Sequence, residues 1–143
     1  MPVEKPFWTI AEPGVAVLRF REHATCDDLL AALRDLASDP ALTPGAPVLV
    51  DTRAALFLPT QHQVLEIAAL LAEERWLRGH RVAVVVGPGA QFGMARMISM
   101  MSELRGGVAG AFLDQEHAMT WLVPDPATGG EKATHSPVAN TPS

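Results

Sequence analysis

The chain has 143 residues, of which 48% are hydrophobic and 19% charged, and its formal net charge is -5. This length fits one domain, and the composition excludes disorder over most of the chain. An acidic chain without a cluster of Lys and Arg argues against nucleic acid as a partner. No apolar run approaches the ~20 residues of a membrane span, so we expect no stable membrane insertion and a cytoplasmic location.

The chain opens with a pattern typical of a β-hairpin. Residues 7–10 are aromatic and β-branched, and Pro13-Gly14 marks a turn. The next segment alternates, with Ala16, Leu18 and Phe20 on one side of the strand. We therefore expect an antiparallel hairpin with one face open to solvent.

A first helix follows the hairpin. Thr25 is its expected N-cap and Asp28 the capping-box partner, and leucines recur at helical spacing as far as Leu36. Cys26 is the only cysteine, which excludes an intrachain disulfide. We interpret it as a small apolar filler rather than a reactive thiol.

Two short valine-rich segments predict the centre of a sheet. Residues 48–50 and 81–86 are mostly apolar, as expected for strands buried on both faces. Between them, Thr60 and Gln63 form a second capping-box pattern, for a helix that we expect to reach about Arg78.

The last part of the folded chain repeats this alternation of strand and helix. Residues 87–89 break the second valine-rich strand and open a methionine-rich helix, which ends at residues 105–107. Residues 108–113 predict the last strand, and Asp114 caps a final helix. The composition of the remainder predicts a flexible tail, so we divide the chain into a domain at 1–123 and a tail at 124–143.

The resulting order is β-β-α-β-α-β-α-β-α, which predicts an α/β fold. We expect a small mixed sheet of about five strands with an N-terminal hairpin, flanked by about four helices, with the later strands parallel.

Polar and glycine residues collect where the strands are expected to end. Ligands of open α/β sheets usually bind beyond the carboxyl ends of the strands. The residues placed there are Asp51, Thr52, Arg53, Gly87, Gly89 and Asp114, with Arg96 one turn into the following helix. We interpret Asp51 and Arg53 as a strand-end charge pair or cap rather than catalysts, and Asp114 as an ordinary helix cap.

Nothing in the sequence marks a catalytic or metal-binding constellation. The five histidines have no metal-ligand spacing, and no Ser-His-Asp or Cys-His set is recognisable. We therefore expect no metal, no cofactor and, on balance, no enzyme.

Methionines are concentrated in the helix that follows the glycine loop. Met94, Met97 and Met101 are spaced to share one face, which we expect to pack on the sheet. Met100 lies off that face and indicates a second contact, either an apolar ligand or a subunit of a homodimer.

The glycine loop itself allows a different hypothesis. Residues 87–93 join a strand to a helix, as a phosphate-binding loop would. The spacing is one residue too long for the dinucleotide fingerprint, with Phe92 in place of the third glycine, and no Gly-Lys-Ser/Thr follows. We favour a tight turn and keep nucleotide or anion binding as an alternative.

Taken in order, these segments resemble the STAS family, in its SpoIIAA-like, anti-sigma-factor-antagonist branch. The resemblance rests on soft motifs over about residues 7–123: the hairpin, the Thr25 helix, residues 48–51, residues 81–86, the helix start at 92–96 and residues 114–122. It implies a small mixed sheet flanked by helices and a regulatory, protein-binding role. Members that act as phosphorylation switches carry a serine turn where this chain has Thr52, which makes Thr52, or Thr60 further on, a phosphorylation candidate.

The first functional hypothesis is thus a non-catalytic binding or regulatory module that acts through protein–protein interaction. The alternative is binding or carriage of a small apolar or lipid-like acidic ligand, because Met94, Met97 and Met100 accompany Arg53 and Arg96.

Overall fold

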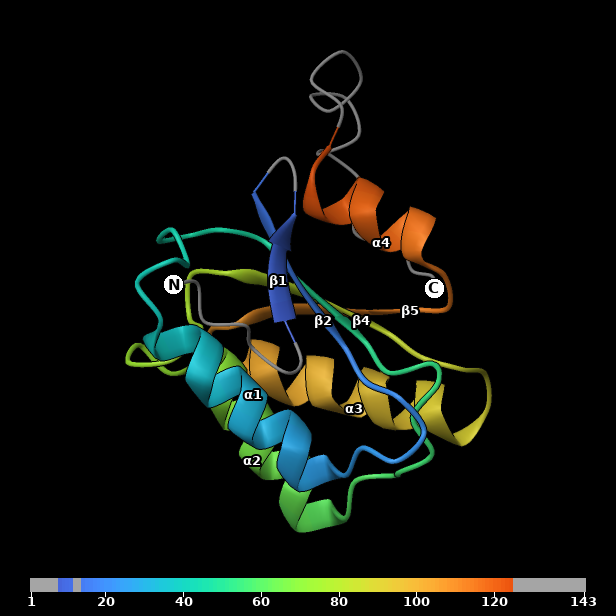
Figure 1. Ribbon diagram of the computed structural model, residues 1–143. Coiled ribbons are helices and arrows are strands. Elements are labelled where there is room, and N and C mark those ends of the chain that lie inside the picture. Colours follow the sequence, from blue (N-terminus) through green and yellow to red (C-terminus); the bar gives the residue numbers. More distant parts are fainter. Residues whose placement is uncertain (1–7, 12–13, 125–143) are drawn as a thin grey trace.

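A computed structural model of the protein describes residues 8–11 and 14–124 (Figure 1). Apart from Pro124, the predicted C-terminal tail lies outside the described residues.

Five strands form one mixed sheet in the order β1-β2-β3-β4-β5. β1 is antiparallel to β2, and every later neighbour pair is parallel. The strands are β1 (Trp8–Ala11), β2 (Val15–Arg19), β3 (Val48–Asp51), β4 (Arg81–Val85) and β5 (Val108–Phe112). The predicted α/β class, with its hairpin and mixed sheet, is confirmed.

Helices cover both faces of this sheet, so the domain has three layers (Figure 1). Three helices, α1 (Cys26–Ser38), α2 (Gln61–Ala72) and α3 (Ala90–Leu104), lie on one face, and α4 (Gln115–Leu122) lies on the other. Of the helices in the described part of the chain, none has the length and apolar character needed to cross a bilayer.

The two predicted capping boxes are present in full. Thr25 accepts the Asp28 N–H at 3.1 Å and its own N–H donates to the Asp28 carboxylate at 2.8 Å. At the start of α2, Thr60 and Gln63 exchange the equivalent pair of bonds at 3.2 and 2.9 Å. Each box satisfies two N–H groups that a helix start otherwise leaves unpaired.

The core is split by the sheet into two clusters. The larger cluster lies under α1, α2 and α3 and contains Phe20, Leu33 and Leu71, and the smaller lies under α4. Val15 is fully buried in this smaller cluster and Val17 packs against it. The expected solvent-exposed face of the hairpin is therefore wrong at the start of β2, where Val15 is buried in the cluster under α4, whereas Arg19 on β2 and Thr9 and Ala11 on β1 are exposed.

The predicted end of the second helix is also wrong. α2 stops at Ala72, and the Glu73 N–H makes the last helical bond, to Ala69 O at 2.9 Å. The chain then turns back, so that the Leu77 N–H donates to Leu70 O at 3.1 Å and the Leu77 side chain is fully buried. Burial of this leucine stabilises the turn against continuation of the helix.

α3 packs on the sheet mainly through small residues. The buried side chains of α3 are Ala95, Ile98, Ser99 and Ser102. Met94 and Met101 are half-buried at the margin, whereas Met97 is exposed. The methionine face expected to pack on the sheet is thus only partly buried.

Gly107, just before β5, is a point where α2 and the sheet approach closely. A Cβ atom there would lie 2.8 Å from Leu71 O and 3.2 Å from Ala72 Cα, both backbone atoms, and would also contact the Ser102 hydroxyl.

Gly107→Ala should therefore lower the free energy of unfolding by about 1–3 kcal/mol in urea denaturation. The matched control is Gly93→Ala, because an added Cβ at this exposed helical glycine meets nothing within 4 Å. That change should raise stability by up to about 1 kcal/mol, and equal stability of the two variants would contradict the packing argument.

Candidate functional site

The connections that leave the carboxyl ends of β2, β3, β4 and β5 gather on one side of the molecule (Figure 1). We call this side the strand-end edge, and define it as Arg19, Asp51 and the segments 52–60, 86–89 and 113–114. Parallel strands bring these segments together although they are distant in the sequence.

Asp51, the last residue of β3, is the electrostatic centre of the strand-end edge. It is 8% exposed, and its carboxylate accepts bonds from Arg19 Nη1 at 2.9 Å and from Arg53 Nη2 at 2.8 Å. Arg53 also donates its Nε at 3.0 Å and its backbone N–H at 3.1 Å to the other oxygen. The predicted pair of Asp51 and Arg53 is confirmed, and Arg19 is a partner that the sequence did not indicate.

These bonds decide the charge of the buried carboxyl. Burial by itself raises the pKa of Asp51, but the hydrogen bonds and charge of Arg53, with the charge of Arg19, more than offset this and lower it. The hydrogen bond to Asp51 likewise raises the pKa of Arg53. Asp51 is therefore ionised at neutral pH and bound to two guanidinium groups.

Arg19 links this centre to α4. Its Nη2 donates to Gln115 Oε1 at 3.1 Å, at the start of that helix. Asp114 caps α4 as predicted, since it accepts the His117 N–H at 2.8 Å and contacts His117 Nδ1 at 2.7 Å. These contacts lower the pKa of Asp114 and raise that of His117.

Thr52, the phosphorylation candidate, lies inside the protein. It is 6% exposed, and both its N–H and its hydroxyl point to Val85 O, at 2.9 and 3.4 Å. This burial argues against phosphorylation of Thr52. Thr60 is exposed, but its hydroxyl is used in the cap of α2.

The glycine loop is closed by a glutamine that sequence reasoning missed. Gln91 Oε1 accepts the Gly87 N–H at 2.8 Å, and Gln91 Nε2 donates to Ala55 O at 2.8 Å. The Gly87 amide is therefore already paired and is not free for a phosphate. Gly89 is exposed with φ +80°, which a glycine adopts without strain.

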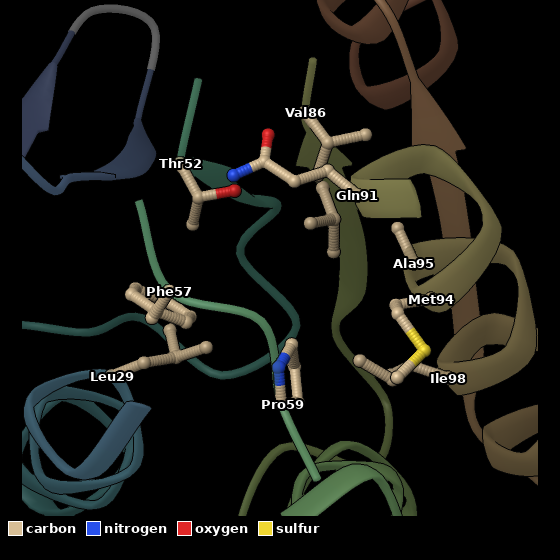
Figure 2. Close-up of a pocket in the computed structure, with 10 residues that line it drawn as sticks. Leu29, Thr52, Phe57, Pro59, Val86, Gln91, Met94, Ala95 and Ile98 are labelled. Atoms are coloured by element: carbon tan, nitrogen blue, oxygen red, sulfur yellow. The ribbon is translucent and has the colours of Figure 1, made fainter. Parts of the chain in front are cut away.

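A mainly apolar hollow lies beneath the segment that follows β3 (Figure 2). Its volume is about 40 Å³, and about 340 Å³ when all the space up to and including the solvent at its open mouth is counted. Phe57 and Leu29 lie on one side and Met94 on the other, and Thr52 and Gln91 lie together at one end (Figure 2). The full lining is Leu29, Thr52, Phe57, Pro59, Val84, Val86, Gln91, Met94, Ala95 and Ile98.

The structure separates the predicted site residues into three places. The strand-end edge holds Asp51, Thr52, Arg53, Gly87 and Gly89; the hollow holds Met94; the outer face of α3 holds Arg96, Met97 and Met100. Arg96 lies over the ring of Phe92, 6.0 Å from its centre, and neither Arg53 nor Arg96 lines the hollow. The arginines and methionines therefore do not form one ligand site.

Residues that catalysis or metal binding commonly uses lie at several separate places in the described part of the chain. No three of the His, Cys, Asp and Glu side chains within 8–11 and 14–124 are placed to hold a metal ion. His117 and Asp114 form an exposed pair, and no hydrogen bond in this part of the chain joins His117 to a hydroxyl or thiol. Cys26 is buried, and burial, followed by the charges of Asp27 and Glu66, raises its pKa to about 11.

Comparisons with known protein families, with curated proteins and with solved structures found no match to this chain.

Removal of the Asp51 charge should destabilise the fold in a pH-dependent way. Asp51→Asn replaces the two charged oxygens that bind the arginines with one neutral oxygen and an NH₂ donor, and should cost about 1–3 kcal/mol at pH 7. The pKa of Asp51 in the folded protein lies below the unfolded value of about 3.9. The ionised carboxylate therefore adds to the free energy of unfolding above about pH 3.9, and this stabilisation is lost as the pH falls through the folded pKa.

The difference between Asp51→Asn and wild type should therefore shrink below about pH 4, as measured by urea denaturation across pH. Glu74→Gln is the control, since it removes a carboxylate charge at an exposed position in the turn after α2 and should change stability by less than about 0.5 kcal/mol. A difference that is constant from pH 7 to pH 3 would contradict the assignment.

Proposed function

We propose that the protein is a non-catalytic regulatory module of the STAS/SpoIIAA-like type, which binds a protein partner through the strand-end edge in the cytoplasm. The observation that carries the proposal is the composition of this edge. Arg19 and Arg53 lie there together with three exposed leucines, Leu56, Leu58 and Leu113, which are 78%, 49% and 50% exposed.

The two arginines suit recognition of a partner. Their side chains remain 54% and 41% exposed although both bind Asp51, so they retain N–H donors for a second acceptor. Because Asp51 already fixes their orientation, less side-chain entropy is lost when a partner binds. Arginine is enriched at the energetic centres of protein interfaces, and its planar fork matches carboxylates.

The exposed leucines supply the apolar part of such a contact. Leu56 and Leu58 flank Phe57, which points into the hollow, and Leu113 follows β5 directly. Large apolar side chains that are exposed close to one another on a surface are typical of a site that another molecule covers. We infer a partner that presents apolar groups beside at least one carboxylate.

The resemblance to the STAS family supports the same proposal, since that family contains regulatory, protein-binding modules. The supporting features are the N-terminal hairpin, the parallel strands and the exposed turns at their carboxyl ends. The buried hydroxyl of Thr52 sets this chain apart from members that are switched by phosphorylation of a serine turn. Our proposal therefore does not include a switch at Thr52.

Leu56→Asp tests this proposal without disturbing the core. We expect a partner captured by the wild type to bind the variant at least about tenfold more weakly, because an acidic group would replace an apolar contact and face the partner's carboxylate. Leu104→Asp is the matched control at a similarly exposed leucine at the far end of α3, and should leave binding unchanged. Binding would be measured by calorimetry with the purified partner; equal loss in both variants, or none in Leu56→Asp, contradicts the proposal.

A second candidate is the binding of a small apolar ligand in the hollow. It is favoured by the lining, in which Thr52 and Gln91 are the polar residues and the remainder are apolar. The absence of arginine from this lining favours an uncharged ligand over the acidic lipid expected from the sequence. Anion binding at residues 87–93 is supported less, because Gln91 occupies the Gly87 amide.

Native mass spectrometry of freshly purified protein tests the ligand proposal. If the hollow holds an apolar compound, a small bound mass should be retained, and Ala95→Leu should reduce it because the new side chain fills the lined space. Ala54→Leu adds the same side chain at an exposed position and should retain the mass. No retained mass, together with no thermal shift from a panel of small apolar compounds, would exclude this function.

A further inference from the structure

The outer face of α3 carries an apolar stripe that no element within residues 8–11 and 14–124 covers. It consists of Gly93, Met97, Met100 and Leu104, whose spacings of four, three and four residues place them on one side of a helix. Met97 is 44% exposed, Met100 57% and Leu104 85%. Such a stripe is the pattern by which one helix packs against another.

Two opposite charges accompany the stripe along one of its flanks. Arg96 and Glu103 are seven residues apart, so they lie almost in line along the helix, and both are exposed. Neither forms an ion pair within the described part of the chain; Arg96 has the ring of Phe92 beside it. The stripe is thus bordered by a positive group towards one end and a negative group towards the other.

We propose that this face binds α3 of a second copy of the chain, with the two helices antiparallel about a two-fold axis next to Met100. In an antiparallel pair related by a two-fold axis, the charged flanks of the two helices lie on the same side of the contact. The order of the two charges along one helix is then the reverse of their order along the other. Arg96 then lies opposite Glu103 of the partner subunit, and the reverse pair forms as well. Met97 lies between Met100 and Leu104 of the partner subunit, in the manner of a knob in a hole.

Charge complementarity selects this occupant and this direction. In a parallel pair, equal residues lie at the same height and the two charged flanks lie on opposite sides, so neither ion pair can form. An unrelated partner helix would need both its charges and its apolar spacing to match, whereas a second copy supplies both. Because three large side chains form the apolar contact, we expect a weak, reversible dimer rather than an obligate one.

Charge reversal tests the pairing directly. In sedimentation equilibrium over a wide concentration range, wild type should dimerise, and Arg96→Glu or Glu103→Arg alone should each weaken the dimer by about tenfold or more. The double variant Arg96→Glu/Glu103→Arg should recover dimerisation, because both ion pairs are restored with reversed sign. Arg21→Glu, a reversal at an exposed residue between β2 and α1, should have no effect, and circular dichroism would confirm that every variant is folded.

Single cysteines distinguish the antiparallel dimer from other contacts. In a Cys26→Ser background, Met100→Cys should form a disulfide dimer on mild oxidation, because the two copies of residue 100 are offset by only about 1.5 Å along the helices. Met97→Cys should not, since its copies are offset by about 8 Å, beyond disulfide reach. A monomer at every concentration, no recovery in the double charge variant, or equal cross-linking at both positions would each overturn the proposal.

The dimer goes beyond the proposed partner binding and uses a different face. Leu104→Asp should weaken self-association while partner capture is retained, and Leu56→Asp should have the opposite effect. Either proposal can therefore fail without the other.

Discussion

The strand-end edge depends on one buried carboxylate that is bound by two guanidinium groups. A charge at the position of Asp51 is tolerated only when it is paired and hydrogen-bonded. Arg19 and Arg53 provide this pairing from β2 and from the turn after β3, and Arg19 extends it to Gln115 on α4. The ionised Asp51 thus fixes the relative positions of the neighbouring strands β2 and β3 and, through Arg19, the position of α4 against them.

Most of the fold was predictable because its signals are local. The valine-rich strands and the capping boxes at Thr25 and Thr60 depend on residues within a few positions of one another. The two errors have a tertiary origin. α2 ends early because Leu77 turns back to bury its side chain, and Val15 on the second face of β2 is buried in the cluster that lies under α4.

The candidate site was less predictable for the same reason. The pair of Asp51 and Arg53 is visible in the sequence since the residues are two positions apart, but Arg19 reaches Asp51 from 32 positions away. Gln91 donates a hydrogen bond to Ala55 O, 36 positions away, and no periodicity in the sequence predicts this contact. Spacing also grouped Met94 with Met97, although only the packing of α3 decides which methionine is covered.

The packing of α3 on the sheet also explains why Met97 and Met100 are exposed to solvent. The helix lies against β5, whose central residues Ala109, Gly110 and Ala111 are small, and three of the four residues that the helix buries are small as well, Ile98 being the exception. The close packing of these two surfaces leaves Met97 and Met100 outside the contact. The exposed methionines therefore contribute little to the core, and polar residues at 97 and 100 would satisfy the fold equally well. Their presence in line with Leu104, beside opposite charges that form no ion pair within residues 8–11 and 14–124, is what the proposed second helix would explain.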